Sequence, residues 1–77
     1  MRRVDEIAWA YFAQLERRLR SHSKLIEGSI ALKTKRAYKG NEIYQYRAIF
    51  KCQKTFKVRM VYIDHLGRVS NTICKFR

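Results

Sequence analysis

Proline is absent from this 77-residue chain, which also has only three glycines and two cysteines. With so few residues that interrupt helices and strands, most of the chain is expected to adopt regular secondary structure. Two cysteines are too few for a disulfide scaffold, and no secretory signal pattern is present. No apolar run reaches the roughly 18–20 residues that cross a bilayer. We therefore expect a cytoplasmic (intracellular, reducing) protein without a membrane span, encoded by a complete small open reading frame of the kind found in phages and mobile elements.

Acidic residues are scarce as well, because six Asp and Glu against 18 Lys and Arg give a formal net charge of +12. The excess is not confined to a tail: residues 1–40 contain ten cations and four carboxylates, and residues 41–77 contain eight and two. A field of this sign favours polyanions or an acidic protein surface as partners. Hydrophobic residues still make up 47% of the chain, which is enough for the core of one small domain, residues 1–77.

The clearest pattern in the chain is the alternation of apolar with polar or basic residues between 43 and 63. This segment, IYQYRAIFKCQKTFKVRMVYI, is typical of two half-buried antiparallel strands. A three-residue loop would pair Cys52 with Phe56 and keep the apolar residues of both strands on one face. A two-residue loop would place Phe50 beside Lys57 and mix the faces. We therefore predict the three-residue loop.

The remaining segments predict one helix and two more strands. Residues 3–21 carry apolar side chains at helical spacing, residues 29–38 alternate before a turn at 39–41, and residues 68–76 alternate after a turn that contains Gly67. The predicted fold is α+β, with one N-terminal amphipathic helix packed on a four-stranded antiparallel meander sheet (α-β-β-β-β). This layout resembles, in architecture alone, the helix-wrapped sheet of cystatin-like folds. The Gln-x-Val-x-Gly inhibitory loop of cystatins is absent, so the resemblance implies no shared function.

Both outer turns are predicted to be type I turns closed by a bulge glycine, Gly40 in one and Gly67 in the other. The strand pairs that follow are Ala37 with Asn41, Leu32 with Tyr46, Asp64 with Arg68, Val58 with Cys74, and Phe56 with Phe76. In this register Cys52 and Cys74 point inward from strands that are not neighbours. Their Cα atoms would be about 10 Å apart, beyond the reach of a disulfide, so we predict two core thiols.

The predicted register gathers cations on the sheet face that points away from the helix. A row of cations on a rigid sheet can follow the phosphates of a nucleic acid. Because nearly every aromatic residue points inward, bases find no stacking platform, and we expect non-enzymatic binding to the backbone of duplex DNA or structured RNA. The candidate binding residues are Lys33, Lys35, Arg47, Lys51, Lys57 and Arg59 on the sheet, with Arg17 and Arg20 at the end of the helix. The competing explanation is that these cations only keep an exposed sheet soluble and protect its edges.

Aliphatic residues on the same face support an alternative function. Ile43, Ile49 and Val61 make this face unusually apolar for a solvated sheet. Trp9 lies on the polar side of the helix, where it is either covered by neighbouring chain or anchors a partner. A homodimer formed through this face is also possible in principle, but it would bring cations of the two copies together. An acidic partner protein therefore fits this face better. The alternative is therefore a small phage- or mobile-element-type modulator that binds an acidic or nucleic-acid-handling host protein.

The sequence contains no recognisable catalytic or metal-binding constellation. There are no paired carboxylates, no Ser-His-Asp set and no phosphate-binding loop, and the cysteines and histidines lack zinc-finger spacing. We therefore predict no catalytic residues, no metal and no cofactor. The run YQYRAIFKCQKTFKVRMVYIDH is faintly similar to small toxin endoribonucleases of the RelE/ParE type, which would give Lys57, Arg59, Tyr62 and His65 a role on RNA. That family has a helical hairpin before its sheet, whereas this chain has room for one helix, so an endoribonuclease is the second alternative.

Overall fold

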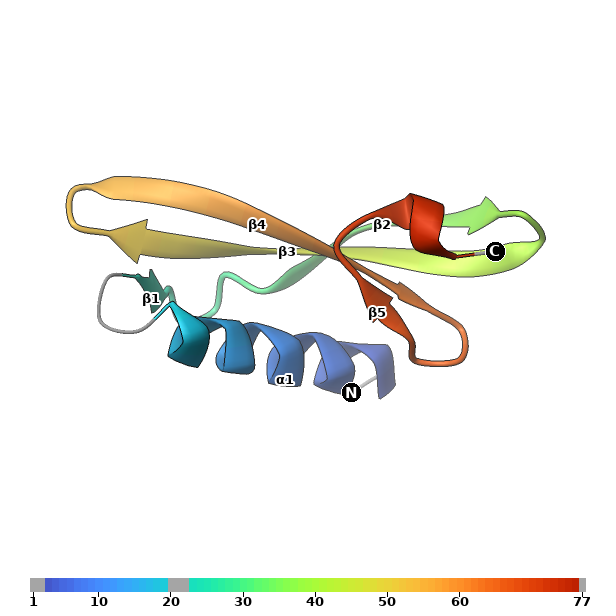
Figure 1. Cartoon of the computed structure of the whole chain (residues 1–77), viewed down its shortest axis with the longest axis horizontal. Coiled ribbons are helices and arrows are strands. Elements are labelled where there is room, and N and C mark those ends of the chain that lie inside the picture. The colour runs from blue at the N-terminus through green and yellow to red at the C-terminus, as the bar shows by residue number, and fades with distance from the viewer. Residues whose placement is uncertain (1–2, 20–22, 77) are drawn as a thin grey trace.

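The computed structural model describes residues 3–19 and 23–76 and shows one helix beneath an antiparallel sheet (Figure 1). The elements in chain order are helix α1 (Arg3–Arg18), strands β1 (Lys24–Leu25), β2 (Ala31–Tyr38), β3 (Asn41–Cys52), β4 (Thr55–Asp64) and β5 (Val69–Ser70), and a 3-10 helix, η2 (Ile73–Lys75). The predicted α+β class with an N-terminal helix is confirmed. The strand count differs by one, because β1 forms where the sequence predicted a connector.

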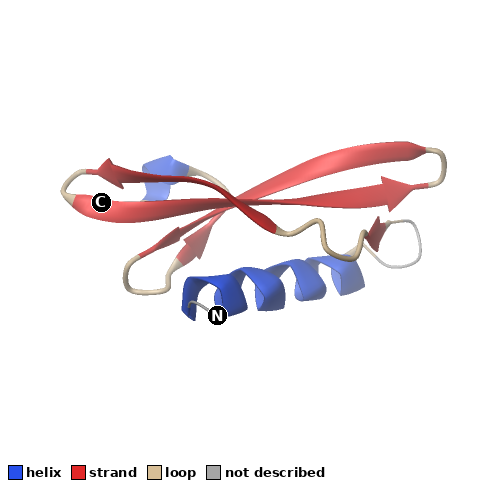
Figure 2. Cartoon of the chain, turned by 180° about the vertical axis from the view of Figure 1, so that it is seen from behind, coloured by secondary structure: helices blue, strands red, loops and turns tan. Residues whose placement is uncertain are grey.

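Strand β3 is the centre of the sheet. It pairs with β4 from Ile43 to Cys52 on one edge, and with β1 and then β2 on the other edge. Between β1 and β2 the chain turns at Gly28, and Ser29 bridges the gap: its hydroxyl accepts a hydrogen bond from the Ile49 N–H at 3.0 Å and donates one to the Ile26 carbonyl at 2.7 Å. The side chain thus replaces a missing strand partner for a backbone N–H. Figure 2 shows this interrupted edge from behind.

Helix α1 covers only the middle of the sheet. Its acidic residues lie in the first turn and its basic residues in the last, as the helix dipole favours. Ala8 and Phe12 are fully buried, and the Phe12 ring lies 6.2 Å from that of Phe50 on β3. The Glu16 carboxylate accepts a hydrogen bond from the Leu25 N–H at 2.6 Å, which ties the end of the helix to β1. Both long hairpins, β2–β3 and β3–β4, extend beyond the helix (Figure 1).

The predicted register between β3 and β4 is wrong by one residue. A two-residue turn at Gln53 and Lys54 pairs Cys52 with Thr55, so Phe50 does lie beside Lys57. The residues of β4 that share the core face with Phe50 are therefore Val61 and Ile63, and both are fully buried. Phe56, Val58 and Met60, which the sequence placed inside, point outward and have exposed fractions of 61%, 53% and 43%.

The physical reason for this error is that the core is shorter than the hairpin. The prediction required one apolar face along the full length of β4. Only the part of β4 that contains Val61 and Ile63 belongs to the core cluster with α1 and β3. Nearer the turn, Lys57 and Arg59 take the same side of the strand without being buried.

The turn between β2 and β3 also differs from the prediction. Lys39 and Gly40 form a two-residue turn with φ values of +51° and +81°, so Tyr38 rather than Ala37 pairs with Asn41. Two positive φ values in succession are those of a type I′ hairpin turn. Leu32 nevertheless pairs with Tyr46, as predicted, because the register shifts at Lys33. The extra residue expected in the turn lies in the strand instead.

The turn before β5 is the one that the sequence predicted correctly. Gly67 has φ +84°, the Gly67 N–H donates to the Asp64 carbonyl at 3.0 Å, and the Asp64 N–H donates to the Arg68 carbonyl at 3.0 Å. The strand then ends at Ser70, so the predicted pairs of Cys74 and Phe76 with β4 do not form. The 3-10 helix crosses the sheet on the side opposite α1 (Figure 1).

The predicted core thiols are wrong for the same reason. Cys74 lies on the 3-10 helix and is exposed, Cys52 is half-buried, and both are free. Phe76 is buried beyond the 3-10 helix, and Ile43, at the same end of the sheet, is buried as well. One end of the outer sheet face is therefore covered, and the other end, at the β3–β4 turn, carries the exposed apolar residues.

Candidate nucleic-acid interface at the end of the β3–β4 hairpin

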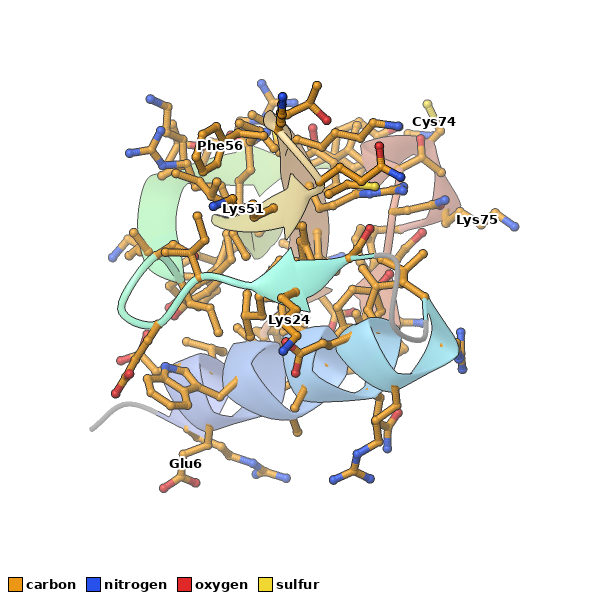
Figure 3. All side chains as sticks on the ribbon, turned by 90° about the vertical axis from the view of Figure 1, so that its left-hand side faces the viewer. Glu6, Lys24, Lys51, Phe56, Cys74 and Lys75 are labelled. Carbon is orange, nitrogen blue, oxygen red and sulfur yellow. The ribbon has the colours of Figure 1, made fainter. Side chains whose placement is uncertain are left out.

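Most of the few carboxylates of this chain are engaged in internal interactions. Four of the six form a hydrogen bond or ion pair within the protein: Asp5 with the Tyr46 hydroxyl, Glu16 with the Leu25 N–H, Glu42 with Lys35, and Asp64 with Arg68. Glu6 and Glu27 are exposed, and Glu6 points away from the sheet on the far side of α1 (Figure 3). Residues 43–63 contain no carboxylate at all but five cations. The β3–β4 hairpin is therefore the part of the fold with the least compensated positive charge.

Asp64 is the buried carboxylate among these and stabilises the turn to β5. It accepts hydrogen bonds from the Leu66 N–H at 3.0 Å, the Arg68 N–H at 2.8 Å and the Arg68 Nε at 2.6 Å. Burial is the largest single influence on the pKa of Asp64 and raises it. The two hydrogen bonds from Arg68, its charge and the Leu66 N–H together outweigh burial, so the pKa of Asp64 lies below its ordinary value.

Lys35 is the one predicted sheet cation that takes part in an ion pair within the described part of the chain. Its Nζ lies 2.9 Å from Oε1 of Glu42 and 5.9 Å from the centre of the Tyr44 ring. The hydrogen bond from Lys35, followed by that from the Tyr44 hydroxyl, lowers the pKa of Glu42 below its ordinary value. Part of the positive charge of Lys35 is therefore compensated.

The six sheet cations predicted to bind nucleic acid do not share one face, which corrects the prediction of a single row. Residues paired directly across two strands share a face, so Lys57 and Arg59, opposite the buried Phe50 and Ala48, lie on the helix side. The outer face keeps Arg47 and Lys51. Lys35 pairs with Tyr44 and so lies on the helix-side face, whereas Lys33 lies at the register shift of β2. Arg17 is exposed on the last turn of α1, and Arg20 lies outside the described residues.

A different cluster forms at the outer end of the hairpin. Lys24 on β1 pairs with Lys51 on β3, and Lys51 pairs with Phe56 on β4. The three side chains thus form a row across three strands, and the Nζ of Lys51 lies 5.9 Å from the centre of the Phe56 ring. Figure 3 looks at this end of the molecule, where Lys24 lies lowest, next to α1, and Lys51 and then Phe56 lie above it. We call these residues the hairpin row.

Two of the three members of the hairpin row were missed in the sequence. Lys24 was assigned to a connector, because a two-residue strand has too little alternation to recognise. Phe56 was assigned to the core through the wrong register. Nothing in the sequence around Lys24 indicates that it lies beside Lys51, which is 27 residues further along the chain. Only the pairing of β1 with β3 brings the two lysines together.

The outer face beside the hairpin row is apolar and borders an open strand edge. Phe56, Val58 and Met60 follow one another on the same side of β4. Among the described residues, β4 has a partner other than β3 only at Tyr62 and Ile63, which pair with β5. The part of β4 nearer the turn is thus an edge strand, and cations on such a strand oppose edge-to-edge association.

The residues predicted as protein anchors have different environments. Ile43 and Val61 belong to the buried residues, with exposed fractions of 1% and 0%, so they cannot contact a partner as predicted. Ile49 is half-buried. Trp9 is exposed over 52% of its surface, so neighbouring chain does not cover it among the described residues. Of the predicted anchors, Trp9 is the one that this structure presents to solvent.

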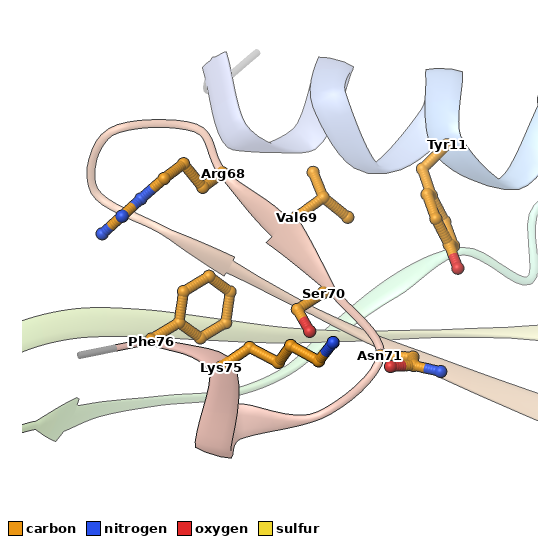
Figure 4. Close-up of a pocket in the computed structure, with 7 residues that line it drawn as sticks. All are labelled: Tyr11, Arg68, Val69, Ser70, Asn71, Lys75 and Phe76. Atoms are coloured by element: carbon orange, nitrogen blue, oxygen red, sulfur yellow. The ribbon is translucent and has the colours of Figure 1, made fainter.

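An open pocket of about 400 Å³ lies between α1 and the C-terminal segment, remote from the hairpin row. It is lined by Tyr11, Arg68, Val69, Ser70, Asn71, Lys75 and Phe76 (Figure 4). The charge of one of its two cations, Arg68, is compensated by Asp64. The other cation, Lys75, is exposed on the 3-10 helix. This pocket therefore offers less uncompensated charge than the hairpin.

The residues of the endoribonuclease alternative do not lie on one surface. Lys57 and Arg59 are on the helix-side face, Tyr62 is on the outer face beside Gln45, and His65 is exposed in the turn after β4. Within residues 3–19 and 23–76, no group of three or more His, Cys, Asp or Glu side chains is arranged to hold a metal ion. In the same residues, no helix is both long enough and apolar enough to span a bilayer.

Comparison with known proteins adds no relative. No protein-family model matches the chain, and no curated protein or solved structure is significantly similar to it. A functional hypothesis must therefore come from the residues of the hairpin and their surroundings.

Proposed function

We propose that this protein binds nucleic acid, and that the outer end of the β3–β4 hairpin contacts the phosphates through Lys24, Lys51 and Arg47. The observation that carries this proposal is the pairing of two exposed lysines, Lys24 and Lys51, directly across neighbouring strands. Like charges in this position destabilise a sheet. Neither lysine forms an ion pair with any described residue. A phosphate bound between them would remove the repulsion and release counterions.

The charge of the whole molecule supports the same proposal. At +12 the protein attracts polyanions over long range. Its exposed carboxylates, Glu6, Glu27 and Glu42, all lie outside residues 43–63, so this part of the hairpin has no acidic side chain of its own. Arg47 lies on the same outer face as Lys51, four residues away along β3 and hence about 13 Å distant. It is placed to contact a second phosphate.

The test compares two double variants with the same net charge. Lys24→Gln/Lys51→Gln removes the paired lysines, whereas Arg3→Gln/Arg18→Gln removes two exposed cations of α1. Binding of fluorescently labelled oligonucleotides is measured by anisotropy between about 50 and 200 mM salt, where six phosphate contacts would change the affinity about a thousand-fold.

We expect the lysine double variant to bind more weakly and to reduce the slope of log K against log salt by about 0.7–0.9, the contribution of the one phosphate that the two lysines share. The arginine double variant should keep most of the slope. Equal losses in both variants would mean that net charge alone attracts the nucleic acid, without a site. No binding by the wild-type protein at the lower salt would exclude the function.

A modulator that docks on an acidic protein is the second candidate, and the exposure of Trp9 favours it. Exposed tryptophan is frequent among the residues that dominate protein interfaces. Trp9→Ala should then weaken capture of an acidic protein from nuclease-treated extract, while the lysine double variant should not abolish it. Equal capture by wild type and Trp9→Ala would remove Trp9 as an anchor.

A further inference from the structure

The corrected register changes which form of nucleic acid the hairpin can bind. The expectation of duplex DNA or structured RNA depended on an outer face without aromatic residues. Phe56 lies on that face instead, exposed over 61% of its surface. An exposed aromatic ring on a sheet, beside cations, is the arrangement on which single-strand binders stack bases.

Building on the proposed function, we infer that the ligand is single-stranded, with one base stacked on Phe56 and the neighbouring phosphate held by Lys51 and Lys24. The hairpin row supports this by its order: the aromatic ring is at one end and the two cations follow at the spacing of adjacent strands, about 4.8 Å each. A nucleotide has the same order, because its base and its phosphate are separated by the sugar.

The apolar residues beside the row extend this surface along β4. Val58 and Met60 follow Phe56 at intervals of about 6.7 Å on the same face and are also exposed. They offer apolar contacts to the faces of further bases or to sugars. Arg47, opposite Met60, lies at the other end of this track. The strand of nucleic acid would run along the hairpin, with its bases over β4 and its phosphates over β3.

A duplex cannot use this surface in the same way. Its bases are stacked on one another and present only their edges in the grooves. It would contact the lysines and leave the exposed faces of Phe56, Val58 and Met60 in water. Single strands should therefore bind more tightly than a duplex, despite the higher charge density of the duplex.

The experiment compares four probes of about 12 nucleotides, a length within the range of single-strand sites. They are a single strand, made as DNA and as RNA, the duplex of the same sequence, and a strand of equal charge whose bases have been removed. Phe56→Ala is the test variant. Trp9→Ala is the matched control, because it removes an exposed aromatic residue of α1. Because Phe56 is exposed, its removal is expected to leave the fold intact, which circular dichroism checks.

We expect Phe56→Ala to weaken binding of the single strand by about five- to 150-fold, the range for loss of one stacked base. It should leave binding of the base-free strand unchanged, and Trp9→Ala should change neither. The inference is overturned if the base-free strand binds as tightly as the intact one, or if the duplex binds more tightly. The lysine double variant separates the two proposals, because it should weaken all probes if phosphate binding is correct, whatever the outcome for Phe56.

A second readout follows the stacking directly. In the double variant Trp9→Phe/Phe56→Trp, the single tryptophan of the chain is moved into the hairpin row. Stacking of a base on the indole should quench its fluorescence, whereas the base-free strand should not. Light scattering tests the competing use of this surface. If the wild-type protein is a dimer that Phe56→Ala dissociates, the row joins two copies of the chain, and the inference is wrong.

Discussion

Two valines on β4, three residues apart, allow the strand register to be tested with one kind of substitution. Val61 is fully buried among the residues of the core, whereas Val58 is exposed over 53% of its surface. Replacement of either by alanine removes the same two methyl groups and the same β-branch. The intrinsic preference of valine for strands is therefore lost in both variants. The difference between them reports only the environment of the side chain.

The expected magnitude follows from burial. Removal of two buried carbon groups at Val61 costs about 1.6 kcal/mol in transfer free energy, and the remaining cavity adds about 1 kcal/mol. We expect Val61→Ala to lower the free energy of unfolding by about 2–3 kcal/mol, a large part of the roughly 4–12 kcal/mol available to a chain of this size. Val58→Ala should cost no more than about 0.5–1 kcal/mol.

Urea unfolding followed by circular dichroism measures both values. With a slope of about 1 kcal/mol per molar urea, the midpoint of Val61→Ala should fall by about 2–3 M and that of Val58→Ala by less than about 1 M, with equal slopes. If Val58→Ala is as destabilising as Val61→Ala, or more so, β4 is shifted by one residue. The turn would then contain three residues, Phe56 would be buried, and the proposed single-strand site would lose its aromatic platform.

Three further predictions concern the turns and the helix. The pKa of Asp64 is lowered in the folded protein, so the contribution of this carboxylate to stability is present above its pKa in the unfolded chain and is lost as the pH falls through its folded pKa. Asp64→Asn should therefore lower the free energy of unfolding by about 1.5–3 kcal/mol near neutral pH and make the melting temperature fall less steeply in acid than it does for the wild type. An equally steep fall in both proteins would contradict this prediction. Gly67→Ala should destabilise more than Gly40→Ala in thermal unfolding, because both residues have positive φ but only a Cβ at Gly67 would lie 3.1 Å from Cδ1 of Ile7; equal losses would mean that backbone conformation alone matters. Trp9→Ala should change the free energy of urea unfolding by less than about 0.5 kcal/mol, and a larger loss would show that Trp9 is packed.

Several features of this protein follow from the sequence alone. The net charge of +12 and its even distribution are properties of composition. The helix follows from apolar residues at helical spacing, and the inner face of β3 from alternation that holds through Tyr46, Ala48 and Phe50, all of which are buried. The turn at Gly67 was predictable because glycine supplies the positive φ that a type I turn with a bulge requires, and Gly67 has φ +84°. In each case the sequence pattern lies within a few neighbouring residues, or it repeats along a helix or strand that contacts the core for much of its length.

The tertiary structure alone decided which side of β4 faces the core and which cations lie together. Both sides of that strand carry apolar residues, so its alternation allows either register, and the position of α1 selects the one that buries Val61 and Ile63. The choice places Phe56 outside and divides the predicted row of cations between two faces. Lys24 meets Lys51 only because β1 joins the free edge of β3. A sequence pattern describes one strand at a time, whereas the candidate site is a row across three strands, and the energy of packing fixes their relative positions.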